Sequence, residues 1–177
     1  MRPNRTITCL LPAFQPKVQE LLRVLTARGE HPMVFETVRS EERHAWLVRQ
    51  GKSKARGLSM HCYGAAVDII DRKRRWSNPD FFKVLGEEAQ KLGLTWGGDW
   101  DNNADTKERF YDGPHVQALS VAKQDEFRAL KPSDRDAFIA ELLGEVSHAE
   151  RQEADYAPTA AEREALACLP EEERGEA

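Results

Sequence analysis

The pattern of apolar and polar positions predicts helices and strands in alternation along the first part of the chain. Residues 16–30 place apolar side chains on one face of a helix, and Gly29 is suited to end it. Residues 32–38, rich in branched and aromatic side chains, predict a strand. A second helix is expected over residues 40–52, where Ser40 can cap the first turn. The apolar positions of the first helix are Val18, Leu21, Leu22 and Leu25.

The middle of the chain predicts the central strand of a sheet. Residues 62–70, CYGAAVDII, have the pattern of a buried strand, and the polar stretch after them indicates a turn. A third helix is expected over residues 81–94, and a short strand or turn over residues 111–117. Together these elements predict an α+β domain in which helices pack on a small, mainly antiparallel sheet.

The end of the chain predicts helices with a strong acidic charge. Ser133 is placed to cap a helix over residues 134–154, and Thr159 with Glu162 forms a capping-box pattern. Residues 145–177 hold ten acidic side chains against three arginines, a net charge of −7 in a chain whose total is −4. The remaining +3 makes the body mildly basic, which would suit contact with an anionic polymer without establishing one.

Composition narrows the class of protein. With 177 residues, 40% hydrophobic and 32% charged, the chain has the size and make-up of a soluble domain. No apolar run approaches the roughly 20 residues that span a bilayer, so we expect no membrane insertion. Pro12 interrupts the short apolar run near the start, and we interpret the start as mature protein without a clear signal peptide. The basic run at residues 71–76 is interpreted as a solvated turn, and we expect no nucleic-acid partner.

A histidine and a carboxylate in the central strand suggest metal chemistry. His61 and Asp68 are seven residues apart, so in a straight strand their side chains point to opposite faces. Gly64 permits a bend that would bring them together. A catalytic zinc takes three protein ligands, and His115, which follows the YDGP turn, is the best candidate for the third. Asp112, three residues earlier, would then face a metal-bound water as a general base.

Plainer interpretations of these residues stay open on spacing alone. A histidine beside a strand is often a core residue with satisfied hydrogen bonds, and Asp68 could end the strand. Cys62, next to His61, is interpreted as a small buried residue. The three cysteines, Cys9, Cys62 and Cys168, are far apart and lack the spacing of a disulfide framework or a CxxC zinc site.

The order of these residues resembles the VanY-type zinc peptidases. The pattern SxHxxGxAxD begins at Ser59 and ends at Asp68, the block GLTWGGDW follows, and an acid then precedes a histidine by three positions. Within that family the chain is most similar to the L-alanyl-D-glutamate endopeptidases of phage endolysins and bacterial cell-wall hydrolases. The likeness runs from about residue 36 to residue 117 and leaves the tail uncovered.

The resemblance implies a fold, a cofactor and a reaction. It implies a hedgehog/DD-peptidase-like fold, with a zinc peptidase catalytic domain over residues 1–145 and an acidic helical tail over residues 146–177. It implies that His61, Asp68 and His115 hold Zn2+. The implied substrate is the peptide stem of peptidoglycan, cut between L-Ala and D-Glu, and we favour a monomer that acts on the cell wall after release from the cytoplasm.

The resemblance also implies roles for residues around the metal. Asp112 would activate water, and Arg39 would stabilise the oxyanion near the scissile carbonyl. Ser59, Trp96 and Trp100 would contact substrate or form the walls of a cleft. Asp99 is a weaker candidate for support of a ligating histidine.

Two departures from the family pattern concern substrate fit. His44 stands where many relatives have Gln, and Val116 where they commonly have Phe. The polar loop after Trp100 is also somewhat long for the family.

Rival functions remain. A D-alanyl-D-alanine carboxypeptidase of the same family would use the same metal chemistry, and a zinc-bearing binding domain would keep the ligands without catalysis. A non-haem iron oxygenase is disfavoured, because such sites place the first histidine two residues from the carboxylate.

Overall fold

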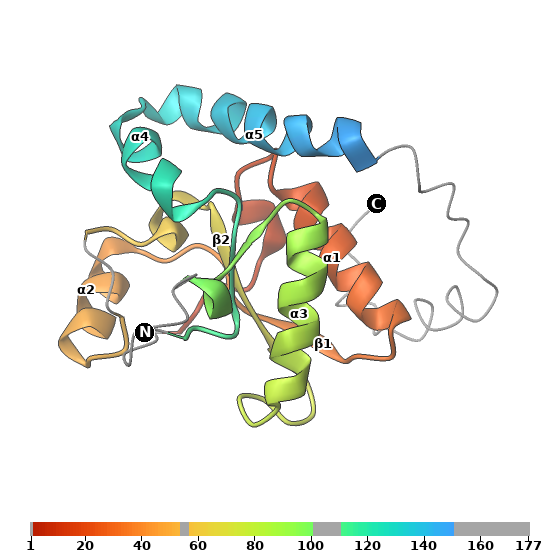
Figure 1. The fold of residues 1–177 in the computed structure, drawn as a ribbon. Coiled ribbons are helices and arrows are strands. Elements are labelled where there is room, and N and C mark those ends of the chain that lie inside the picture. The colour runs from red at the N-terminus through yellow and green to blue at the C-terminus, as the bar shows by residue number, and fades with distance from the viewer. Residues whose placement is uncertain (1, 54–56, 101–110, 151–177) are drawn as a thin grey trace, which may run out of the picture.

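The computed structural model describes residues 2–53, 57–100 and 111–150, and side chains as far as residue 144. The polar loop expected at 102–110, the capping box at Thr159 and Glu162, and Cys168 lie outside the described residues. Within the described part, four strands form one antiparallel sheet in the order β1-β2-β4-β3, with helices around it (Figure 1). The strands are β1 (Pro32–Glu36), β2 (Ala66–Asp71), β3 (Thr95–Trp96) and β4 (His115–Gln117). The predicted α+β class is confirmed.

Four of the described helices correspond to predicted ones with shifted ends, and α4 (Gln124–Ala129) was not predicted. The four are α1 (Gln15–Ala27), α2 (Glu41–Arg49), α3 (Pro79–Lys91) and α5 (Arg135–Glu150). Ser40 caps α2 as expected, because its side chain accepts a hydrogen bond from the Arg43 backbone N–H. Helix α3 begins two residues earlier than predicted, since Asn78 accepts from the Phe81 N–H and Pro79 suits the first turn.

The strand expected from residue 62 begins later. Met60–Tyr63 form a 3-10 helix instead, which ends at Gly64 with φ +71° before β2 starts at Ala66. A side chain on Gly64 would lie 3.2 Å from backbone atoms of Cys9 and Leu11, so glycine suits both the conformation and the space. The predicted bend at Gly64 is confirmed, and it is a helical turn.

The hydrophobic core lies mainly between the sheet and the pair α1 and α3. Strand β2 alternates, so that Val67, Ile69 and Asp71 share one face while Asp68 points to the other. Helices α1 and α3 pack on one side of the sheet and α2 lies on the other (Figure 1). Fully buried side chains from the helices and β2 form the core: Val18, Leu21, Leu25, Val67, Ile69, Phe81, Leu85 and Ala89.

Helix α5 joins the same core. Ile139 and Leu143 are buried in it, and the Asp136 side chain accepts a hydrogen bond from the Ala13 N–H at 2.8 Å. The guanidinium of Arg135 lies 4.6 Å from the centre of the Tyr63 ring. The expected cap at Ser133 is wrong, because Ser133 donates to Asp134 within a 3-10 turn that precedes α5.

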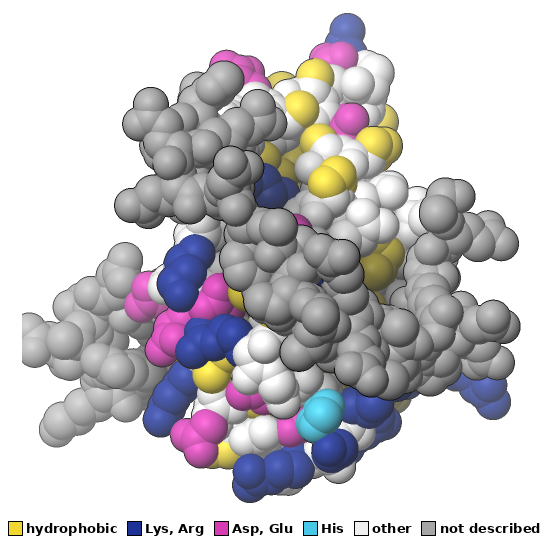
Figure 2. All heavy atoms as spheres, turned by 90° about the vertical axis from the view of Figure 1, so that its right-hand side faces the viewer, with side chains coloured by type: hydrophobic (Ala, Val, Ile, Leu, Met, Phe, Trp, Pro, Cys, Tyr) yellow, Lys and Arg dark blue, Asp and Glu magenta, His cyan; other side chains and the backbone are white. Residues whose placement is uncertain are grey.

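The outer surface of the helix layer is charged in both signs. Figure 2 shows Lys and Arg side chains beside Asp and Glu on this side of the molecule. Ion pairs between exposed or partly exposed side chains of these helices include Arg23 with Glu20 in α1 and Lys83 with Asp80 in α3. Among the described residues, no helix combines the length and the apolar character that crossing a membrane requires.

Candidate metal centre

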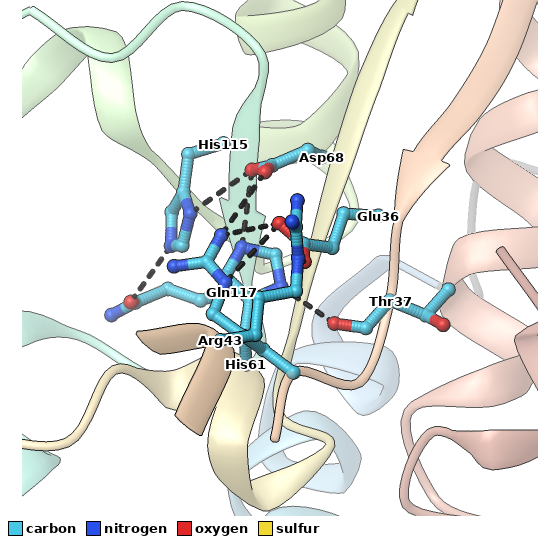
Figure 3. A network of polar contacts seen from close by, with 8 residues as sticks. Glu36, Thr37, Arg43, His61, Asp68, His115 and Gln117 are labelled. Carbon is cyan, nitrogen blue, oxygen red and sulfur yellow. Dashed lines mark hydrogen bonds and ion pairs between the residues drawn. The ribbon is translucent and has the colours of Figure 1, made fainter. Parts of the chain in front are cut away.

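Three side chains meet on the face of the sheet opposite α1 and α3. Asp68 in β2 lies directly across from His115 in β4, and His61 reaches them from the 3-10 helix before Gly64 (Figure 3). Asp68 Oδ1 lies 3.1 Å from His61 Nε2 and 3.3 Å from His115 Nδ1. One ligand atom from each residue lies within 4.8 Å of the others. The structure thus brings together the three residues predicted as metal ligands.

The other ring nitrogen of each histidine is held by an oxygen acceptor. His61 Nδ1 donates to the Thr37 carbonyl oxygen at 2.7 Å, and His115 Nε2 donates to Gln117 Oε1 at 3.2 Å. Gln117 is itself oriented, because its Nε2 donates to the Leu119 carbonyl oxygen at 2.5 Å. His61 Nε2 and His115 Nδ1 are therefore the unprotonated nitrogens, and they face Asp68. These are the tautomers that a metal would need.

The electrostatics of the cluster favour positive charge. Burial pushes the pKa of Asp68 upward, but His61 and His115 outweigh it and hold the pKa of this carboxyl well below its ordinary value. Burial opposes a charged His115 ring, yet the Asp68 carboxylate raises the pKa of His115. A buried carboxylate between two imidazoles therefore attracts a cation. Nitrogen and oxygen donors of this kind suit Zn2+, so the residues present fit the ion that the resemblance implies.

Asp112 lies in the turn that leads into β4. Its carbonyl oxygen accepts from the His115 N–H at 3.1 Å, and its own N–H donates to the Gly97 carbonyl oxygen at 3.0 Å. A side chain on Gly97 would come within 2.5 Å of the Asp112 carbonyl oxygen and 2.9 Å of the His115 Cβ, so only glycine allows this approach. Burial raises the pKa of Asp112 above its ordinary value.

Arg39 lies beside the cluster and is held by Glu36. The Arg39 Nη2 lies 3.6 Å from Asp68 Oδ2 and 2.6 Å from Glu36 Oε2. Arg43 Nε donates to the other oxygen of Glu36. All three side chains are almost fully buried. Figure 3 shows this network joined to the two histidines through Asp68.

A cavity of about 540 Å³ opens over these residues. Its lining includes seven of the nine predicted site residues: Arg39, Ser59, His61, Asp68, Trp100, Asp112 and His115. The ring centre of Trp100 lies 5.0 Å from that of His115. Trp96 is not among the lining residues, because its indole packs on Gly86 and Gly98 and donates to the Gly113 carbonyl oxygen at 2.7 Å.

Two further expectations about side chains near the site are wrong. Asp99 accepts a hydrogen bond from Gln90 at 3.1 Å, and the support for the histidines comes instead from Thr37 and Gln117. Cys62 is only half-buried, because it lies in the 3-10 helix rather than in a strand.

Sequence reasoning missed Glu36, Thr37, Arg43, Gln117 and Gly97. The signal for Gln117 is its position two residues after His115, on the same strand face. Glu36 ends β1 and precedes Arg39 by three residues, but that spacing has no meaning until the strand is paired with β2.

Comparison with known proteins relates the segment that carries the site to known peptidases. Residues 52–118 match the family described as D-alanyl-D-alanine carboxypeptidase. The L-alanyl-D-glutamate peptidase of Listeria phage A118 is 32% identical over 104 residues, which are 56% of this chain and 34% of the phage protein. The chain therefore spans about a third of that relative's length.

Two bacterial proteins are also similar. Peptidoglycan L-alanyl-D-glutamate endopeptidase CwlK of Bacillus subtilis is 29% identical over 131 residues, covering 62% of this chain and 74% of that protein. The solved structure of the Serratia marcescens L-Ala D-Glu endopeptidase ChiX has 26% identity and a TM-score of 0.38, over 61% of this chain and 87% of ChiX. Residues 52–118, which hold His61, Asp68, Asp112 and His115, thus match the D-alanyl-D-alanine carboxypeptidase family, and the chain is similar to L-alanyl-D-glutamate peptidases over a longer stretch.

Proposed function

We propose that the protein is a zinc-dependent peptidase that hydrolyses the peptide stem of peptidoglycan between L-Ala and D-Glu. The observation that carries the proposal is the buried group of His61, Asp68 and His115, which shares one cavity with Asp112 and Arg39. The names of the two relatives support the choice of bond.

His61, Asp68 and His115 would hold the ion. His61 donates from Nδ1 and His115 donates from Nε2, each to an oxygen acceptor, so the ring nitrogen that faces Asp68 carries a free lone pair. Three protein ligands match a catalytic rather than a closed structural site. When bound, zinc would lower the pKa of a water toward about 7 and polarise the scissile carbonyl.

Asp112 would move the proton. Its carboxyl is half-buried at the cavity, and its raised pKa makes it a stronger base than an exposed aspartate. It would accept the proton of the attacking water and then deliver it to the leaving amine. Its position three residues from His115, in a turn held against Gly97, would keep it beside the ligands without making it one.

Arg39 would stabilise the negative charge that develops on the carbonyl oxygen. Its guanidinium is buried, lies at the cavity wall and reaches within 3.6 Å of Asp68. A fixed cation in a site of low dielectric stabilises such charge more than it would in water. Trp100 and Ser59, which line the same cavity, would contact the bound peptide.

The closest alternative is a D-alanyl-D-alanine carboxypeptidase. The description of the matching family favours it, whereas the names of the relatives favour the endopeptidase. Both reactions would use the same residues, so the difference lies in which part of the stem the cavity accepts.

Digestion of peptidoglycan by the purified full chain tests the proposal. Mass spectrometry of the products should show stems that begin with D-Glu, and a chelator should abolish them until zinc is added back. Products that lack only a terminal D-Ala would show the carboxypeptidase instead. No cleavage with full zinc occupancy would favour a binding domain.

We also propose that residues 1–145 suffice for this chemistry and that the acidic tail at 146–177 serves another purpose. Every proposed site residue precedes Val116, and the family match ends at residue 118. The protein would act on the cell wall as a monomer.

A further inference from the structure

We propose that Glu36 is a positioning residue for catalysis, which fixes the Arg39 guanidinium beside the metal ligands. Arg43 offsets the negative charge of Glu36. The proposal rests on the proposed function, because it needs Arg39 to act on the reacting carbonyl. It adds two side chains, Glu36 and Arg43, that contact neither the metal nor the reacting atoms.

Glu36 holds Arg39 by two hydrogen bonds. Arg39 donates from Nε at 3.1 Å and from Nη2 at 2.6 Å, both to Glu36 Oε2. The carboxylate is 1% exposed, so solvent cannot compete for these bonds. A guanidinium held through two donors has little freedom to rotate, which keeps its charge in one place.

A β-bulge puts Glu36 on the correct face of the sheet. Val34 pairs with Ile69 and Glu36 pairs with Asp68, so two steps along β1 match one step along β2. Without this irregularity Glu36 would oppose Val67, and its side chain would point away from the cavity. The bulge therefore brings a buried carboxylate to the same face as Asp68.

Arg43 gives the group an excess of positive charge. A single arginine paired with a single carboxylate forms a neutral pair, which would stabilise an oxyanion only weakly. Here Arg43 donates to Glu36 Oε1 while Arg39 occupies Oε2, so these three side chains together carry +1. Because all three side chains are about nine-tenths buried, water screens this charge poorly. The Asp68 carboxylate, which Arg39 also approaches at 3.6 Å, would be engaged by the metal.

Glu88 in α3 offers a matched control. Its carboxylate is also buried and also meets two cations, Arg28 at 2.5 Å and Lys91 at 2.7 Å. Those two side chains are 42% and 65% exposed, and Glu88 does not line the cavity. Glu88→Gln thus tests the loss of a buried, doubly paired glutamate away from the site.

The test is a double-mutant cycle on kcat for a stem peptide, with zinc content and thermal unfolding measured on each protein. Arg39→Ala should lower kcat by about 10²- to 10³-fold. Glu36→Gln should lower it by about 10- to 100-fold with zinc retained, because a misplaced guanidinium loses much of its effect. In the Arg39→Ala background, Glu36→Gln should change kcat by less than about twofold. Glu88→Gln should lower the unfolding temperature and leave kcat unchanged.

Arg43 variants test the charge balance even if Glu36→Gln fails to fold. Arg43→Lys keeps the charge and Arg43→Gln removes it, so kcat should fall further in Arg43→Gln. Equal losses in the two variants would overturn the charge argument. Additive losses of Glu36→Gln and Arg39→Ala, or loss of zinc in Glu36→Gln, would overturn the positioning role. If the wild type does not cleave the stem at all, the proposed function itself fails.

Discussion

The two faces of the central sheet are buried by opposite means. On the helix side, Val67 and Ile69 of β2 pack against apolar side chains of α1 and α3. On the cavity side, Asp68 of the same strand meets His61, His115 and Arg39. Neighbouring residues of one strand thus belong to two environments, one held by close packing and the other by charge pairing.

The difference teaches which side serves folding and which serves chemistry. Apolar burial stabilises a fold by about 25 cal/mol per Å², whereas buried ion pairs are often no better for stability than apolar residues of similar size. The cavity side gathers Glu36, Arg39, Arg43, Asp68 and Asp112 where apolar side chains would fold at least as well. Stability alone does not explain them, and the proposed reaction does.

The largest effect is expected from the ligands. His61→Ala, Asp68→Ala or His115→Ala should each strongly weaken zinc binding and abolish cleavage, because a site with two ligands holds the ion poorly. Metal analysis of dialysed protein, together with the stem-peptide assay, measures both. Full zinc occupancy in all three variants would remove the proposed site.

The next largest effect is expected from loss of the proposed general base, Asp112. Asp112→Asn keeps the size of the side chain but cannot accept the proton, so turnover should fall by about 10²- to 10⁴-fold while zinc stays bound. The same two assays apply. Loss of zinc in this variant would make Asp112 a ligand, and a wild-type rate would exclude it as the base.

A substitution in the apolar core on the helix side should lower stability and leave turnover unchanged. Leu85 of α3 is fully buried, so Leu85→Ala should lower the free energy of unfolding by about 2–5 kcal/mol. Denaturant unfolding measures the loss, and kcat per zinc-loaded molecule should remain that of the wild type. A matching fall in kcat would show that the two faces are not separable.

Asp71 tests whether a buried charge on the helix side is only structural. Burial pushes its pKa upward, but hydrogen bonds from Asn78 and from the backbone of Lys73 and Arg74 outweigh this and lower it. Asp71→Asn should therefore lower the free energy of unfolding by about 1.5–3 kcal/mol at pH 7.

The pH dependence of that loss follows from the direction of the shift. A carboxyl with a lowered pKa stabilises the fold above its unfolded pKa of about 3.9, and this contribution disappears as the pH falls through the folded value. The difference between wild type and Asp71→Asn should shrink below about pH 4. Denaturant unfolding at several pH values measures it, and a constant difference would contradict the assignment.

The smallest effect is expected at the C-terminus. A chain that ends at Val146 keeps Ile139 and Leu143, the buried side chains of α5, and every proposed site residue. Its zinc content and its kcat on soluble stem peptide should stay within about twofold of the full chain, because no catalytic contact is removed. Joint loss of both would show that the removed residues complete the core.

Local patterns were enough to predict α1, α2, α3 and α5 and most of the central strand, but not α4. Helical periodicity and Gly29 describe α1, and Ser40 caps α2, because caps and faces depend on neighbours in the chain. Residue types and the bend at Gly64 made His61, Asp68 and His115 candidates, and the resemblance to VanY-type peptidases is what implied that they hold zinc. The form of that bend, a 3-10 helix, depends on packing against Cys9 and Leu11 and was not readable locally.

Other features were decided only when distant segments met. The sequence did not distinguish Trp96 from Trp100 as residues of the cleft. In the structure the Trp96 indole packs on Gly86 and Gly98, whereas Trp100 lies at the cavity beside His115. Likewise, Asp99 pairs with Gln90, whereas Gln117 accepts a hydrogen bond from His115, and the sequence alone did not show which of the two would support the histidine.

The sequence by itself determined the α+β class and the donor types of the metal centre, since both follow from residue chemistry at short range. The tertiary structure decided the environment of those donors. Glu36 reaches the cavity only because a bulge shifts β1 by one residue against β2, and Gly97 matters only because the Asp112 turn packs on it. A shift of one residue reverses the face of a side chain, and such a shift arises from strand pairing rather than from the local sequence.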